Sequence, residues 1–220
     1  MKNKRSIIIE IEVCYIAVLI LVAVSNHIVA FGNTKIIKMI LTILVYAALV
    51  AIPYIISKWK HISLQDFGYS NRKIGQQLLV AGALFAILFC ITILAPILLG
   101  VDRMDVLSFK SSSKGVLIFY LVCNFFCVGF GEEFIFRGYF YQRIKTATDS
   151  EWIGIALSSV LFGLWHYPNG RNIMQVIMTT VIGLIYGIIS HKTKKGTVLS
   201  TSVAHGLHDV AIVALSYIML

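Results

Sequence analysis

Charged side chains are scarce in this chain of 220 residues, where they make up 13% against about 25% in a typical soluble domain. Hydrophobic residues make up 58%, and the mean hydropathy is +0.85. So few charges cannot cover a surface that faces water, which excludes an ordinary soluble domain. The composition indicates a polytopic membrane protein, and the length suits one compact helical bundle.

Acidic residues are the rarer charge, ten against nineteen Lys and Arg, so the net charge is +9. The basic residues are spread over short loops between apolar runs and form no separate patch, so we expect no nucleic-acid partner. A positive-inside bias explains them better. Twelve Lys and Arg fall on the N-terminal side of the predicted bundle and six on the other, which predicts a cytoplasmic N-terminus.

Cysteine is also rare. Cys14, Cys90, Cys123 and Cys127 all lie in apolar stretches, and we interpret them as small buried hydrophobes. Cys123 and Cys127 are four residues apart on one helix, which does not suit a disulfide, and no second pair completes a zinc site. The chain shows no internal repeat and no low-complexity linker, so residues 1–220 are predicted to form a single membrane domain.

Long apolar runs are abundant. We predict an all-α, polytopic integral membrane bundle of about seven transmembrane helices. The first run follows a basic N-terminus but lacks a cleavage site, so we expect it to be retained; water or headgroups should reach Glu10 at its entrance. The predicted spans are 8–31, 36–57, 76–99, 115 to about 144, 152–166, 172–190 and 198–219.

The fourth span carries an unusual polar group. Glu132 and Glu133 are adjacent, and Arg137 follows four residues after Glu133, at the end of a run (115–130) without any charge. The span exceeds the ~20 residues that cross a bilayer, so its end should project beyond the hydrocarbon or the helix should tilt. A carboxylate at bilayer depth costs about 2.5–3.5 kcal/mol on insertion scales, so these residues need partners. Arg137 can pair with Glu133 on the same helix face, which leaves Glu132 free to act.

Two later spans add imidazole and carboxylate groups. His166 closes the fifth span, and the last span carries His205, His208 and Asp209. His205 and Asp209 are four residues apart and share a helix face. Ionisable residues inside membrane spans usually face the bundle interior and mark function.

This set of residues suits hydrolysis. Glu132 with His166 could hold and deprotonate a water, directly or through a metal. His205 and Asp209 could act on the substrate carbonyl as proton donor or metal ligand. A carboxylate and two histidines form a known catalytic zinc site, so Glu132, His166 and His205 are the candidate ligands of a divalent metal such as zinc.

Other interpretations remain open at this stage. Glu133 with Arg137 can be a purely structural ion pair, His166 can be an interfacial residue beside Trp165, and His208 can serve packing alone. A proton pathway inside the bundle, as in a proton-coupled transporter, would explain the whole set.

The order and spacing of three motifs resemble a known family. Glu132-Glu133-x-x-x-Arg137, Phe162-x-x-x-His166 and His205-x-x-x-Asp209, on separate hydrophobic spans, are similar to the CPBP (CAAX protease and bacteriocin-processing, or Abi) family of intramembrane proteases. The resemblance covers about residues 115–212.

The resemblance implies peptide-bond hydrolysis inside a helical membrane bundle, on a membrane-embedded or lipid-anchored peptide or protein. Its members include CAAX endopeptidases, which cut prenylated C-terminal tails, and bacterial proteins tied to bacteriocin self-immunity. By position, Glu132 and His166 would activate water, His205 and residue 209 would stabilise the oxyanion, and Glu133 and Arg137 would support the site. A bacterial plasma-membrane protein is expected. Position 209 departs from the pattern, since Asp stands where Asn is frequent, and an ionised Asp donates no hydrogen bond. A non-catalytic scaffold or immunity protein with the same fold is the main rival.

Overall fold

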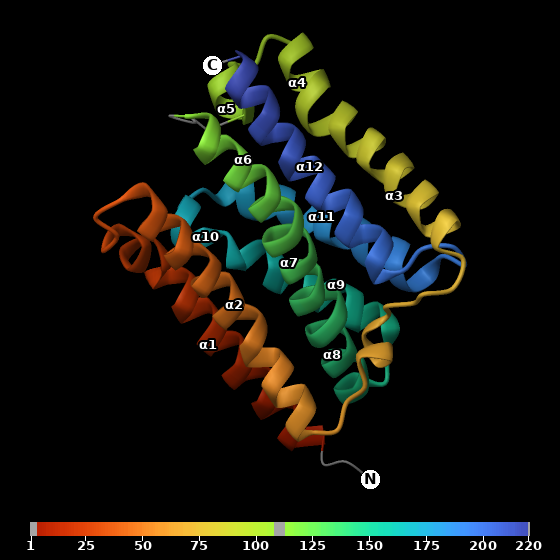
Figure 1. Cartoon of the computed structure of the whole chain (residues 1–220). Helices are drawn as coiled ribbons and strands as arrows, with labels where there is room; N and C mark the ends of the chain where they lie inside the picture. The colour runs from red at the N-terminus through yellow and green to blue at the C-terminus, as the bar shows by residue number, and fades with distance from the viewer. Residues whose placement is uncertain (1–3, 108–112, 220) are drawn as a thin grey trace.

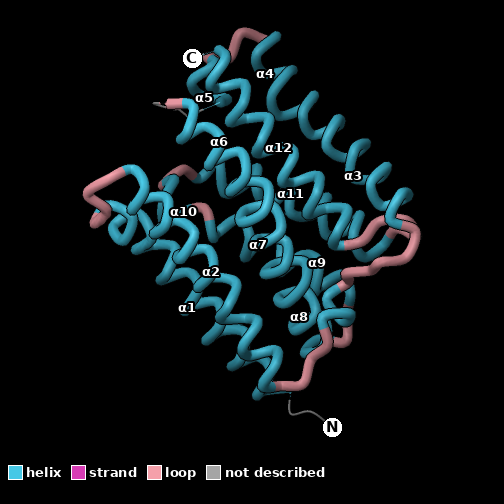
Figure 2. The backbone as a smooth tube through the Cα atoms, in the orientation of Figure 1, coloured by secondary structure: helices cyan, strands magenta, loops and turns pink. Residues whose placement is uncertain are grey.

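The computed structural model describes residues 4–107 and 113–219, and every regular element within them is helical (Figure 1, Figure 2). Among these residues, six helices are long and apolar enough to cross a membrane. The predicted all-α polytopic bundle is therefore confirmed. The six helices run along Lys4–Ala30, Lys35–Trp59, Ile74–Leu98, Lys114–Thr148, Ile173–Lys192 and Val198–Met219.

The fifth predicted span, 152–166, is not among these six helices because it is too short. It corresponds to α9 (Glu151–Trp165), whose 15 residues rise about 22 Å and fall short of a hydrocarbon core of about 30 Å. The Ser150 hydroxyl caps its start by accepting a hydrogen bond from the backbone N–H of Ile153. His166 follows its last residue, and α10 (Tyr167–Gly170) leads into α11 (Ile173–Lys192).

The longest helix, Lys114–Thr148, has 35 residues and a length of about 52 Å, so it exceeds the bilayer core as predicted. Two stretches of it are π-helical, and the two glutamates lie between them. π-Helical turns are rare and occur often at functional sites. Its segments are α6 (Lys114–Cys123), η3 (Asn124–Phe130), α7 (Gly131–Glu133), η4 (Phe134–Phe140) and α8 (Tyr141–Thr148).

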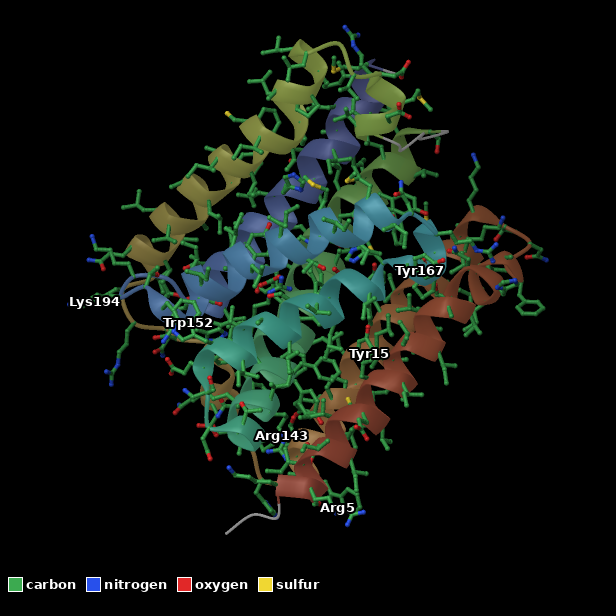
Figure 3. All side chains as sticks on the ribbon, turned by 180° about the vertical axis from the view of Figure 1, so that it is seen from behind. Arg5, Tyr15, Arg143, Trp152, Tyr167 and Lys194 are labelled. Atoms are coloured by element: carbon green, nitrogen blue, oxygen red, sulfur yellow. The ribbon has the colours of Figure 1, made fainter. Side chains whose placement is uncertain are left out.

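A hairpin of α1 (Lys4–Ala30) and α2 (Lys35–Trp59) packs beside this helix, with α1 against α8 (Figure 1). Arg143 on α8 points to the N-terminal part of α1 (Figure 3), where it donates hydrogen bonds of 2.6 and 2.7 Å to the Glu10 carboxylate. Tyr139 donates a third, of 3.0 Å. The expectation that water or headgroups reach Glu10 is wrong, because Arg143 and Tyr139 cover its side chain, which is only 9% exposed.

The last helix, α12 (Val198–Met219), lies between η3 and α3 (Ile74–Phe89). It meets η3 almost backbone to backbone, since a Cβ built on Gly129 would lie 2.6 Å from the Gly206 Cα. Small residues at such a crossing let two membrane helices approach closely. The crossing places the neighbour of Gly206, His205, beside the glutamate pair of the long helix.

The remaining segments close the bundle around these helices. α3 continues through η2 (Cys90–Leu94) and α4 (Ala95–Leu98), and η2 is a π turn that precedes Pro96. α5 (Arg103–Leu107) follows. The polar connection between α2 and α3 contains η1 (Leu64–Phe67), whose Phe67 is fully buried against Gly138 of the long helix.

Large apolar side chains cover the outward faces of the bundle. Ile16, Ile20, Leu44, Ile55 and Leu79 are each more than half exposed. In water this surface would be an aggregation hazard, whereas in lipid it faces a solvent of matching polarity. The composition of the surface and the span lengths together describe a multi-pass membrane protein.

Candidate active site

Glu133 and Arg137 form the buried centre of the site. The Arg137 Nη1 lies 3.0 Å from the Glu133 Oε1, and both side chains are essentially inaccessible to solvent. The guanidinium also lies over the ring of Phe162, with its Cζ 4.2 Å from the ring centre, and 5.4 Å from that of Tyr186. These two aromatic faces add cation–π attraction, so Arg137 is held from α9 and α11 as well as from its own helix.

A glycine on α11 makes room for this arginine. A Cβ built on Gly183 would meet the Arg137 Nη2 at 2.9 Å and the side chains of Phe162 and Ser159 at 3.2 Å. The smallest residue therefore allows the guanidinium to sit between α9 and α11. The sequence alone gave no signal for this role.

His205 connects three carboxylates. Its Nδ1 lies 3.3 Å from the Glu133 Oε1, and its Nε2 lies 3.6 Å from the Asp209 Oδ2 and 4.0 Å from the Glu132 Oε2. A carboxylate only accepts hydrogen bonds, so Nδ1 carries the proton that faces Glu133. Nε2 is left in the gap between Glu132 and Asp209, within reach of a ligand placed there.

Glu132 is buried, 4% exposed, but it lacks the partners of its neighbour. Among the described residues, its Oε2 has no hydrogen-bond partner, and the same is true of the Glu133 Oε2; the two differ because only Glu133 lies in ion-pair contact with Arg137. An unsatisfied buried carboxylate oxygen is costly and needs an explanation, such as a water or a substrate group that occupies the gap. The division predicted for the pair is therefore seen in the structure: Glu133 is paired with Arg137, and Glu132 is not.

His166 lies at the C-terminal end of α9. Its Nδ1 is 2.9 Å from the Phe162 carbonyl oxygen, and its ring contacts the Phe162 ring edge-on at 4.9 Å. Because a carbonyl can only accept, the proton resides on Nδ1 and Nε2 keeps a lone pair in the neutral ring. Within the described residues no hydrogen bond or ion pair joins His166 to Glu132; the Phe162 ring lies between His166 and His205, 5.9 Å from the latter.

Asp209 and His208 complete the last motif. The Asp209 Oδ1 lies 3.5 Å from the His208 Nδ1, and the opposite nitrogen of His208 lies 2.7 Å from the Thr92 hydroxyl oxygen on η2. Thr92 gives its own proton to the Leu88 carbonyl, so His208 donates to it. Asp209 therefore stands between two imidazoles, within ion-pair distance of each ring when that ring is protonated.

The predicted metal ligands are not gathered into one centre. In the part of the chain that the structure describes, no group of three or more His, Cys, Asp or Glu is arranged to hold a metal ion. His205 lies near Glu132, but its Nδ1 is directed to Glu133 and His166 is directed to a carbonyl. The set of Glu132, His166 and His205 thus does not fit a metal in this arrangement, and the zinc hypothesis stays a prediction.

An apolar cavity of about 420 Å³ opens beside the glutamates, between α2 and the long helix. Gly131, the residue before Glu132, forms part of its wall. Its lining is almost wholly hydrocarbon and aromatic, which suits a lipid-like group or an apolar side chain. The lining residues are Ile43, Tyr46, Ala47, Val50, Tyr69, Phe126, Cys127, Phe130, Gly131 and Phe134.

Tyr69 is a residue of the site that the sequence did not reveal, because it lies in a loop far from the three motifs. Its hydroxyl is 3.5 Å from the Ser202 hydroxyl on α12, one helical turn before His205. Burial raises the pKa of Tyr69 well above its usual range, with the charge of Glu133 adding to the effect. The phenol therefore stays neutral and can donate a hydrogen bond beside the glutamates.

The family comparison covers this same region. A family model described as type II CAAX prenyl endopeptidase Rce1-like matches residues 114–211. Comparisons with curated proteins and with solved structures found no match. The matched segment starts with the long helix, ends within α12 and includes all six predicted site residues. The resemblance identified from the three motifs is confirmed, because residues 114–211, a little under half of the chain, match the Rce1-like type II CAAX prenyl endopeptidase family.

Proposed function

We propose that this protein is a glutamate- and histidine-dependent endopeptidase that hydrolyses a peptide bond next to a lipid-anchored or membrane-embedded segment of its substrate. The observation that carries the proposal is the pairing pattern of the two glutamates. Glu133 is neutralised by Arg137, while the buried Oε2 of Glu132 lies 4.0 Å from the His205 Nε2 and has no hydrogen-bond partner among the described residues. A water in that gap would contact a base and an imidazole together.

The reaction begins with this water. Glu132 takes one of its protons while the water oxygen bonds to the scissile carbonyl carbon, and the carbonyl oxygen becomes an oxyanion. Glu132 then passes the proton to the leaving nitrogen as the C–N bond breaks. The second proton of the water passes from the new acid group to the new amine, so the products are a carboxylate and an ammonium, and the enzyme regains its starting form. The neutral His166, with a free Nε2, assists the water from the α9 side.

His205 serves the oxyanion. In its cationic form the Nε2–H donates to the developing charge, while Nδ1 stays anchored on Glu133. The Asp209 carboxylate, 3.6 Å from Nε2, attracts the positive charge that this role needs. Arg137 and Glu133 are thus positioning residues that fix the imidazole, and Asp209 acts through His205 where an Asn would donate directly.

The apolar cavity supports a lipid-bearing substrate. Its volume of about 420 Å³ and its position beside Gly131 would place a prenyl or acyl chain, or an apolar helix face, against the reacting bond. The family is named for CAAX prenyl substrates, which carry such a chain. We therefore expect the substrate to carry a prenylated or similarly lipidated tail. The resemblance and the distribution of Lys and Arg favour a multi-pass protein of the bacterial plasma membrane with its N-terminus in the cytoplasm.

Reconstituted protein tests the proposal. Proteoliposomes are incubated with a fluorescent peptide that carries an S-farnesyl cysteine followed by three residues, and the products are identified by mass. Glu132→Ala and His166→Ala should each abolish cleavage while the protein stays inserted and folded. A non-catalytic scaffold would give no product even in the wild type, and a proton-coupled transporter would move peptide across the bilayer without cutting it.

The biological setting is proposed from the resemblance alone. Bacteriocin processing or self-immunity predicts that a host lacking this protein changes its sensitivity to, or export of, a small secreted peptide. Complementation with Glu132→Ala separates the two uses of the fold. Processing requires the glutamate, whereas immunity by binding does not.

A further inference from the structure

The proposed oxyanion site is poor in hydrogen-bond donors. Its three carboxylates accept hydrogen bonds when they are ionised and donate none. The Nδ1 proton of His166 faces a backbone carbonyl, and the Nδ1 of His205 faces Glu133. Of these imidazole nitrogens, the Nε2 of His205 is the one directed to the gap between Glu132 and Asp209. Since an oxyanion is stabilised best by several preorganised donors, another element of the bundle is expected to supply a second one.

Tyr46 on α2 carries a phenol on the side of the bundle where this gap lies. Its side chain lines the apolar cavity together with Gly131, the residue before Glu132. Val50, one turn further along α2, meets the same glycine, because a Cβ built on Gly131 would lie 3.2 Å from the Val50 Cγ2. The face of α2 that carries Tyr46 therefore packs against the long helix beside the glutamates.

The Tyr46 phenol lies within the electrostatic field of the proposed reaction centre. Of the ionisable groups that act on it, Glu132 acts most strongly, and Asp209 on α12 acts on it as well. In the described parts of the chain, the Tyr46 hydroxyl forms no hydrogen bond with another side chain or with the backbone. A phenol is protonated at neutral pH, so this O–H is a donor without an acceptor in the protein.

Two other tyrosines near the site fit the role less well. The Tyr69 hydroxyl lies 3.5 Å from a serine hydroxyl of α12, so it already has a polar neighbour. Tyr186 is fully buried, its ring centre lies 5.5 Å from that of His205, and it does not line the apolar cavity. Tyr46 combines a hydroxyl without a protein partner with a place on the wall against which a substrate would lie.

Tyr46 also borders a second cavity, of about 250 Å³, between α1, α2, α6 and the end of α9. This cavity has a more polar lining, with Ser25, Asn26, Thr42 and Asn169 among its residues. It has room for several waters, so a water in it is the alternative partner of the Tyr46 hydroxyl. The two partners differ in their consequence, because a hydroxyl that only binds such a water is not needed for the reaction.

We propose that Tyr46 is a further catalytic residue, whose phenol donates a hydrogen bond to the oxyanion beside the Nε2–H of His205. This inference rests on the proposed protease function. It gives the hairpin of α1 and α2, which lies outside the matched residues 114–211, a part in the chemistry. The proton stays on the phenol, and the hydrogen bond strengthens as negative charge develops on the carbonyl oxygen.

Tyr46→Phe tests the inference because it removes one oxygen atom and keeps the ring. In proteoliposomes with the S-farnesyl peptide, this variant should lose about 10²–10³-fold in kcat, as for removal of one oxyanion donor, while KM stays at the wild-type value. Its thermal unfolding should match that of the wild type, because the hydroxyl has no protein partner to lose. Tyr54→Phe is the matched control on the same helix, where the side chain is 39% exposed, and it should keep the wild-type kcat.

Asp209→Asn provides a second readout that a purely structural role of Tyr46 would not change. The asparagine amide can donate to the oxyanion, so Tyr46→Phe should cost less than about tenfold in kcat in that background. An equal loss in both backgrounds would overturn the inference. Wild-type kcat in Tyr46→Phe would assign the hydroxyl to water in the polar cavity, and a raised KM at unchanged kcat would assign the ring to substrate packing; both would overturn the inference and leave the protease intact. No cleavage by the wild type would instead contradict the proposed function.

Discussion

Substitution by glutamine should mainly lower the stability of the protein at Glu133 and mainly lower its activity at Glu132. Glu133→Gln removes the negative charge from a side chain that lies 3.0 Å from the Arg137 guanidinium and 3.3 Å from the His205 imidazole, out of contact with solvent. Arg137 would then remain buried as an uncompensated cation. Breaking a buried ion pair in this way costs about 3–5 kcal/mol. For a chain of this size, that corresponds to a fall in Tm of about 6–20 °C.

Glu132→Gln removes a charge from a side chain whose Oε2 has no hydrogen-bond partner among the described residues. The neutral amide is no harder to bury than the unpaired carboxylate, so stability should change by less than about 1 kcal/mol or rise. Activity should behave differently. Loss of a general base lowers the rate by about 10²–10⁴-fold, and Glu132→Gln should show this loss in a fully folded protein.

Thermal unfolding in detergent and cleavage of the farnesylated peptide measure the two effects on the same preparations. Glu151→Gln, at an exposed ion pair with Lys145 and Lys192, serves as the control for a surface carboxylate. The reasoning would be refuted by a Glu132→Gln variant that unfolds as early as Glu133→Gln. It would also be refuted by a Glu132→Gln variant that is stable and cleaves at the wild-type rate.

Three further predictions concern packing, a distant ion pair and metal. Gly183→Ala should lower the free energy of unfolding by about 1–3 kcal/mol and reduce activity, because the new Cβ would lie 2.9 Å from the Arg137 Nη2. The control Gly82→Ala, whose Cβ would meet no atom within 4 Å, should leave thermal stability unchanged or raise it. Arg143→Met should lower the free energy of unfolding by about 3–5 kcal/mol, because it leaves the Glu10 carboxylate without its cationic partner. Adding Glu10→Gln should restore most of this stability, and equal stability of the single and double variants would contradict the ion pair. Cleavage should survive 1,10-phenanthroline and EDTA, because Glu132, His166 and His205 are not gathered as metal ligands, and a loss that zinc restores would establish the metal-dependent reaction instead.

Much of the site followed from sequence because its residues interrupt apolar spans. Glu132, Glu133 and Arg137 stand out against a charge-free run, and the spacing of four residues correctly predicted the Glu133–Arg137 pair. The overall bundle was equally accessible, since each long apolar run had to become a helix. His205 and Asp209 could be placed together for the same reason of helical spacing.

The rest depended on contacts between distant segments, which spacing does not encode. Glu10 looked water-exposed because its partner Arg143 lies at the far end of another helix. Tyr69 lies in the polar connection between α2 and α3 and reaches Ser202 on α12, so no apolar pattern marked it. The fifth span was placed correctly, but α9 has only 15 residues and is too short to cross a bilayer alone.

The central claim is that Glu132 catalyses peptide-bond hydrolysis in the membrane, and a comparison of membrane peptides from matched cells tests it most directly. Cells that produce the wild type and cells that produce Glu132→Gln at the same level in the membrane are analysed by mass spectrometry. The account predicts peptide fragments with new carboxyl ends in the wild-type cells and the intact substrate in the variant cells. Identical peptide profiles in the two strains, at equal protein levels, would contradict it.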